Sequence, residues 1–136
     1  MGIQFTSKKV GELLKEGNLR IPSYQRPYKW NRKHIRNLFY DLRDAMEKKE
    51  YQVGSVIFHD NGGYLDIVDG QQRLISISLF LHSLEKLKDY EGANQLLGAE
   101  FGEISCYHAS ENYNEWENLT QLVGTSQAKD ICEFLL

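Results

Sequence analysis

The chain turns from a predicted strand into a predicted helix at Asp69-Gly70-Gln71-Gln72-Arg73. The apolar pair Ile67-Val68 precedes this stretch, and an apolar-periodic segment begins after it at Leu74. The first amides of a helix are free to bind an anion, and the helix dipole favours negative charge there. Gly70 allows a close backbone approach, and the guanidinium of Arg73 suits a phosphate. The stretch predicts an anion site, although a plain polar turn with a surface arginine fits the same residues.

Length and composition are those of an ordinary globular protein. The 136 residues are enough for one domain with a core, and 41% of them are hydrophobic and 26% charged. No segment approaches the roughly 20 apolar residues of a membrane span, and no secretion signal is recognisable. The two cysteines, Cys106 and Cys132, form no C-x-x-C pair and resemble reduced thiols. We therefore expect a cytoplasmic protein that does not contact a membrane.

Several helices are expected from caps and apolar spacing. Thr6 or Ser7 is expected to cap a short helix that ends near Gly17. Asn31 is expected to cap a long helix with one buried face. A second long helix is expected over 74–87, directly after the polar turn.

The strands are expected around a tight turn. A largely buried strand is expected over 53–58, a hairpin turn over 60–63 and an antiparallel strand over 64–68. Residues 19–21 run extended into a proline. A small mixed sheet flanked by helices, and hence an α+β fold, follows from this order.

Elements beyond Tyr90 rest on shorter patterns. A strand is expected over 101–107, a helix over 112–123, and a last helix capped by Ser126. No internal repeat or low-complexity linker interrupts this region.

The domain organisation is expected to have two parts. Residues 1–90 are expected to form the core with the polar turn, and residues 91–136 the start of a helical continuation. The chain ends on the apolar run Phe134-Leu135-Leu136 without a stop signal. We therefore expect a boundary inside a longer protein.

Two motifs together resemble a known family. The polar turn is preceded by a loop with an unusual aromatic and basic pattern, and by a short Gly-Ser-Val-Ile segment. The residues concerned are Pro22, Tyr24, Gln25, Arg26, Tyr28 and Trp30 in the loop, 54–57 in the segment and 69–73 in the turn. This order closely resembles the N-terminal domain of GmrSD-type modification-dependent restriction enzymes, over about Arg20 to about Leu84. The resemblance implies a ParB/sulfiredoxin-like fold.

The resemblance also implies a function. Similar domains bind and hydrolyse nucleoside triphosphates, and they regulate or power restriction of modified foreign DNA in prokaryotes. In such proteins a separate C-terminal His-Asn-His domain usually cleaves the DNA, and we expect it beyond Leu136. We therefore expect a role in phage defence, with an NTP as substrate, Mg²⁺ as cofactor and DNA as a partner of the full-length protein. A homo-oligomer is left open.

Individual residues receive expected roles from their places in the motifs. Triphosphate hydrolysis needs cations on the phosphates and a carboxylate that positions metal or water. The expected catalytic residues are Asp69, Gln71, Gln72 and Arg73, with Asp69 as the metal ligand, and the expected nucleotide-binding residues are Tyr24, Gln25, Arg26 and Gly70. A helix cap at Asp69 and a surface ion pair at Arg26 are competing interpretations.

The uneven charge distribution supports a second function. Every charged residue between Glu16 and Asp41 is basic, whereas nine acidic residues and a single Lys129 occur from Asp89 onward. A basic run interleaved with aromatic residues is typical of nucleic-acid binding. A ParB-like nucleic-acid-binding module without turnover is therefore the alternative, and a nucleotide sensor is a third interpretation. The net charge of −3 argues against tight, non-specific duplex binding.

Overall fold

The computed structural model describes residues 6–22, 27–49, 54–101 and 104–136. The helices in these ranges are α1 (Val10–Lys15), α2 (Arg32–Lys48), α3 (Gln71–Ser83), α4 (Glu91–Glu100), α5 (Tyr107–Val123) and α6 (Thr125–Leu135), with a 3-10 turn η1 (Leu87–Asp89). The strands are β1 (Leu19–Arg20), β2 (Ile57–Asn61) and β3 (Tyr64–Asp69). The expected α+β class with a small mixed sheet is confirmed. None of the helices in the described ranges is long and apolar enough to cross a membrane.

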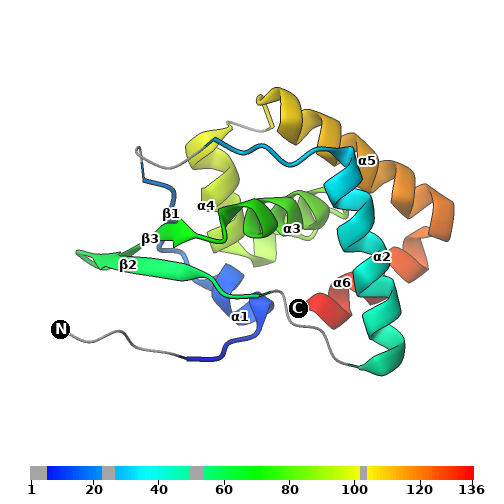
Figure 1. Ribbon diagram of the computed structural model, residues 1–136, viewed down its shortest axis with the longest axis horizontal. Coiled ribbons are helices and arrows are strands. Elements are labelled where there is room, and N and C mark those ends of the chain that lie inside the picture. The colour runs from blue at the N-terminus through cyan, green and yellow to red at the C-terminus, as the bar shows by residue number, and fades with distance from the viewer. Residues whose placement is uncertain (1–5, 23–26, 50–53, 102–103) are drawn as a thin grey trace.

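The three strands form one mixed sheet in the order β1-β3-β2. β1 is parallel to β3, with Leu19 beside Leu65 and Arg20 beside Asp66. β2 is antiparallel to β3, and the intervening Gly62-Gly63 has positive φ at both residues, 64° and 91°, as tight hairpins favour. The expected hairpin is confirmed. Because β1 and β3 are parallel, both strands end at the same edge of the sheet, here named the carboxyl edge, and α3 begins there (Figure 1).

An ion pair fastens the short strand β1 to β3. Arg20 donates from Nε and Nη2 to the two carboxylate oxygens of Asp66, at 2.7 and 3.2 Å. Asn61 Nδ2 donates to the same carboxylate at 3.2 Å, and the guanidinium lies 4.6 Å from the centroid of the Tyr64 ring. The hydrogen bond from Arg20 lowers the pKa of the Asp66 carboxyl. Since a two-residue strand has few ladder hydrogen bonds, this two-point contact helps to set its register.

Helix α3 is the centre of the core. In Figure 1 it crosses the middle of the molecule, with the sheet on one side and α2 and α5 on the other. Nearly its whole circumference is buried, including Leu74, Ile77 and Phe80. Trp116 of α5 stacks on Phe80 with ring centroids 4.3 Å apart, and its Nε1 donates to the carbonyl oxygen of Ser76 at 2.9 Å. The helices after residue 90 therefore cover α3 directly.

The expected capping of α2 is confirmed. Asn31 Oδ1 accepts hydrogen bonds from the backbone N–H groups of Lys33 at 3.0 Å and His34 at 3.4 Å. The His34 ring in turn accepts from the Asn31 backbone N–H at 3.1 Å and stacks on Trp30. The start of α2 is thereby fixed by side chains on both sides of it.

Two other expected caps are wrong. Neither Thr6 nor Ser7 caps α1, whose N-cap is Lys9. Ser126 does not cap α6, because it lies inside that helix and the N-cap is Gly124, with φ of 92°. Both helices bury an apolar face, and this packing sets where they begin.

The second long helix is confirmed with different ends. α3 begins at Gln71 instead of Leu74, and it ends at Ser83. Glu85 adopts a left-handed backbone conformation with φ of 59°, and Leu87 belongs to η1. The helical pattern therefore continues in sequence past the point where the helix itself stops.

Two expectations about strands are wrong. β2 starts at Ile57, which is 53% exposed, so the predicted buried strand is an exposed edge strand; Val53 lies outside the described residues. An edge strand has a neighbour on one side only, which explains its exposure. Among the described residues of the segment 101–107 there is no strand, and Phe101 instead ends α4 and packs its buried ring edge-on against Tyr28, with ring centroids 5.6 Å apart.

The two glycines of α4 provide a test of the packing between α4 and the α1–β1 connection. A Cβ on Gly92 would lie 2.3 Å from the carbonyl oxygen of Glu16 and 2.7 Å from that of Leu14, whereas a Cβ on Gly98 would meet nothing within 4 Å. We expect Gly92→Ala to destabilise the fold by about 1–3 kcal/mol, because backbone has to move. Gly98→Ala should instead stabilise it by about 0.5–1 kcal/mol through helix propensity.

The measurement is urea unfolding followed by circular dichroism, with the midpoints of both variants compared with that of the unmodified chain. Equal midpoints for Gly92→Ala and Gly98→Ala would contradict the close contact.

Candidate functional site

The polar turn lies at the carboxyl edge of the sheet. β3 ends at Asp69, α3 starts at Gln71, and Gly70 between them has φ of 96°. A Cβ on Gly70 would lie 3.0 Å from Val56 Cγ2 and 3.2 Å from the carbonyl oxygen of Ser55. Both the left-handed conformation and this close approach call for glycine. The N-cap of α3 is Gly70, so the helix-cap interpretation of Asp69 is wrong.

The segment before β2 also meets Arg73. Gly54 has φ of 112°, and a Cβ placed on it would lie 2.8 Å from Nη1 of Arg73. Arg73 is exposed in the first turn of α3, and Asp69 is exposed at the end of β3 opposite Ile57. The fold thus brings together the Gly-Ser-Val-Ile segment and the polar turn, which are separate in the sequence.

Gln72 holds the loop that leads to α2. Its Oε1 accepts hydrogen bonds from the backbone N–H groups of Lys29 at 2.8 Å and Trp30 at 3.2 Å. Its Nε2 donates to the carbonyl oxygen of Pro27 at 3.4 Å. Residues 27–30, here named the anchor loop, are therefore attached to the first turn of α3. Gln71 is buried on the same turn, with 5% of its surface exposed.

Three of the expected nucleotide-binding residues cannot be placed. Tyr24, Gln25 and Arg26 lie outside the described residues. The four residues expected to be catalytic and Gly70 are contiguous in the turn, and their expected roles stay predictions.

The chain matches the family model of the GmrSD restriction endonuclease N-terminal domain over residues 10–135. It belongs to this family. The resemblance inferred from the motifs is thereby confirmed, and the match extends well past the region that carried it. No curated protein and no solved structure matches the chain. The ParB/sulfiredoxin-like assignment accordingly stays a prediction.

A buried polar network fixes the other end of the anchor loop in this GmrSD N-terminal domain. The hydroxyl of Tyr28 lies 2.6 Å from Ser76 Oγ. Asn112 of α5 donates from Nδ2 to the Tyr28 hydroxyl and to the carbonyl oxygen of Trp30, both at 2.7 Å. Burial raises the pKa of Tyr28 to about 12. Tyr28 is 1% exposed, so its side chain anchors the loop in the core.

Sequence reasoning missed Asn112. Its signal is its spacing, because it shares a buried helix face with Ala109, Trp116 and Leu119. A single polar residue at a core position of a helix needs a polar partner. In the GmrSD N-terminal domain that partner is the anchor loop, so α5 takes part in positioning the candidate site.

Removal of the Gln72 side-chain amide should release the anchor loop. We expect Gln72→Ala to speed hydrogen exchange of the Lys29 and Trp30 backbone amides several-fold, since a hydrogen bond contributes roughly 0.5–1.5 kcal/mol. The measurement is amide exchange followed by NMR. Gln121→Ala on the exposed side of α5 is the matched control and should leave both amides unchanged. Unchanged exchange in Gln72→Ala would contradict the attachment.

Tyr28 should make stability fall at high pH. Its pKa is about 12 in the folded state against 10.0 for the unperturbed phenol, so the folded chain keeps a proton that the unfolded chain loses. The contribution is complete below pH 10 and is lost as the pH rises toward 12, at up to about 1.4 kcal/mol per pH unit. Urea midpoints of the unmodified chain should fall more steeply over this range than those of Tyr28→Phe. Parallel pH profiles would contradict a buried phenol.

Proposed function

We propose that this GmrSD N-terminal domain binds a nucleoside triphosphate at the carboxyl edge and hydrolyses it with Mg²⁺. In this proposal the reaction serves restriction of modified DNA in prokaryotic phage defence, in the cytoplasm. The main support is the meeting of Asp69, Gly70 and Arg73 at the start of α3, with residues 54–56 packed against the turn.

The start of α3 has the properties of a phosphate site. Its N-cap is a glycine without a capping side chain, and its first turn contains no acidic residue. The 13-residue helix therefore presents its positive end without a neutralising carboxylate of its own. Arg73 adds a guanidinium to the same turn, and a guanidinium pairs with phosphate oxygens in two-point geometry.

Asp69 fits a metal ion that arrives with the nucleotide. Among the residues that the structure describes, no group of three His, Cys, Asp or Glu side chains gathers as a metal site. Mg²⁺ is commonly held by only one or two carboxylates together with substrate phosphates and water. The exposed Asp69 at the end of β3 matches this mode, and Mg²⁺ bound there would offset charge on the phosphates.

The remaining residues have supporting parts in the proposal. Gln72 keeps the anchor loop against the turn, which fixes the end of the loop nearest to residues 23–26. Tyr24, Gln25 and Arg26 are proposed to contact the base and the phosphates. Gln71 is proposed to orient water or a phosphate oxygen. A ParB/sulfiredoxin-like ancestry is part of the same proposal.

Phosphate release from each NTP with Mg²⁺ tests the proposal. We expect turnover by the unmodified chain and a loss of at least about tenfold in Arg73→Ala, because cations on the transferring phosphoryl group carry much of such catalysis. Arg43→Ala on the exposed face of α2 is the control for the loss of one arginine. Full turnover in a folded Arg73→Ala variant would overturn the assignment, and binding without turnover would indicate a nucleotide sensor.

A glycine pair tests the position of Arg73 without changing charge. Gly54→Ala should lower turnover, since its Cβ would collide with Nη1 of Arg73. Gly63→Ala introduces a side chain at a similar positive φ, 91°, where nothing lies within 4 Å. Any general cost of the left-handed conformation therefore appears in both variants. Equal turnover in the two would contradict a role for the exact placement of Arg73.

A further inference from the structure

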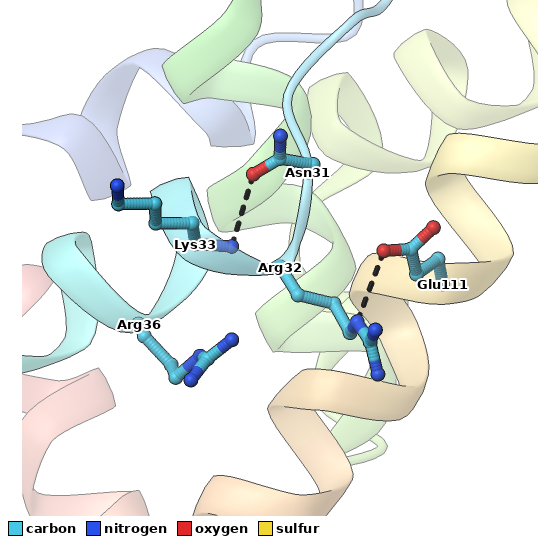
Figure 2. Close-up of a pocket in the computed structure, with 5 residues that line it drawn as sticks. All are labelled: Asn31, Arg32, Lys33, Arg36 and Glu111. Carbon is cyan, nitrogen blue, oxygen red and sulfur yellow. Dashed lines mark hydrogen bonds and ion pairs between the residues drawn. The ribbon is translucent and has the colours of Figure 1, made fainter.

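A second surface with unusual charge lies where α2 meets α5. A pocket of about 230 Å³ is lined by Asn31, Arg32, Lys33, Arg36 and Glu111. Figure 2 shows that the three basic side chains come from the first turns of α2 and that Glu111 of α5 reaches toward Arg32. The set Arg32, Lys33 and Arg36 is here named the α2 basic patch, and it shares no residue with the polar turn.

The patch is cationic toward solvent and acidic beneath. Arg32 Nε lies 3.0 Å from Glu111 Oε1, and Arg36 Nε lies 3.1 Å from Glu115 Oε2. The arginine side chains are 58% and 53% exposed, whereas those of Glu111 and Glu115 are 22% and 11% exposed. The carboxylates therefore hold the guanidinium groups from below. Within the described ranges, no terminal Nη of either arginine donates a hydrogen bond, so these donors are left for a ligand.

Lys33 adds a cation that α5 does not neutralise. It is exposed, and it forms no ion pair with any residue that the structure describes. Residues three and four apart on a helix share a face, so Lys33 and Arg32 both lie beside Arg36. With the two carboxylates of α5 counted, the patch has a net charge of one positive unit, and its exposed outer layer consists of the three basic side chains.

These cations also stand at the unfavourable end of their helix. The positive end of a helix dipole favours acidic residues, yet the first turn of α2 contains none. The backbone amides there are already used, because Asn31 Oδ1 accepts from Lys33 and His34. The dipole thus gives no reason for basic side chains in this position. A local arrangement that works against helix stability is expected at functional surfaces.

We infer that the α2 basic patch binds the phosphate backbone of duplex DNA. The regularly spaced phosphates of a polyanion can supply a partner to each of the three exposed side chains. DNA is the polyanion on which a restriction endonuclease family acts, so this inference rests on the proposed role in DNA restriction. The α2 basic patch belongs to the part of the sequence from Arg20 to Arg36, in which every charged residue is basic.

Anisotropy titrations of a fluorescent duplex of about 20 base pairs with the whole chain test the inference. Lys33→Gln and Arg36→Gln should each weaken binding several-fold, and each should reduce the slope of log affinity against log salt by about 0.9 between roughly 50 and 200 mM NaCl. Lys48→Gln and Arg43→Gln, which lie further along the exposed side of α2, are matched controls and should change neither quantity. Patch variants that behave like these controls would overturn the inference.

Variants of the Arg32–Glu111 ion pair distinguish a DNA-binding role from a purely structural one. Glu111→Gln should tighten DNA binding, because it removes a negative charge beneath the patch, whereas Arg32→Gln should weaken it. If the ion pair only stabilised the fold, both variants would lower the unfolding midpoint. The opposite changes in DNA affinity would then be absent. Competition of millimolar inorganic phosphate with DNA, measured in the Arg73→Ala variant at constant ionic strength, would indicate a small-anion site at the patch and overturn the choice of DNA.

NTP turnover of the same variants keeps the two proposals distinguishable. Lys33→Gln and Arg36→Gln should hydrolyse NTPs at the unmodified rate, because neither residue belongs to the polar turn. Loss of DNA binding in these variants would support the patch even if the unmodified chain showed no turnover. If both variants hydrolysed NTPs normally and bound DNA like the unmodified chain, the inference of DNA binding at the patch would be overturned and the nucleotidase proposal would stand.

Discussion

The burial of α3 is the constraint on which the rest of the structure depends. α4 and α5 cover its sides, and the stack of Trp116 on Phe80 fixes its contact with α5. Only the first turn, with Arg73, is open to solvent at the carboxyl edge. A helix held along its length presents its first turn in a fixed position, and fixed donors bind a charged ligand without having to be ordered first.

The buried hydrogen bonds make the anchor loop part of this rigid unit. Tyr28 connects the loop to α3 through Ser76, and Asn112 connects it to α5. Loss of one partner leaves a buried polar group unsatisfied, at a cost of about 1–3 kcal/mol. The loop is therefore determined by residues from three distant parts of the sequence. The family match, over residues 10–135, includes α5 as well as the two motifs.

Local chemistry made some features predictable and left others beyond reach. The hairpin at Gly62-Gly63 and the cap at Asn31 depend on neighbouring residues only, and both were predicted correctly. The exposure of Ile57 depends on which strand lies at the sheet edge, and the helix end at Phe101 depends on its contact with Tyr28. Within the candidate site, the contiguous turn was evident from sequence. The partners of Gln72 were not, because they lie more than forty residues away.

The anchor loop also connects the two proposed binding surfaces. Its Lys29 and Trp30 amides bind Gln72 in the polar turn, and the next residue, Asn31, caps α2 beside the basic patch. A ligand that shifts Gln72 must therefore either break these hydrogen bonds or move the start of α2. Such a continuous path of contacts is a physical route for coupling. Coupling of this kind is reciprocal, so a nucleotide that strengthens DNA binding would be bound more tightly in the presence of DNA by the same factor.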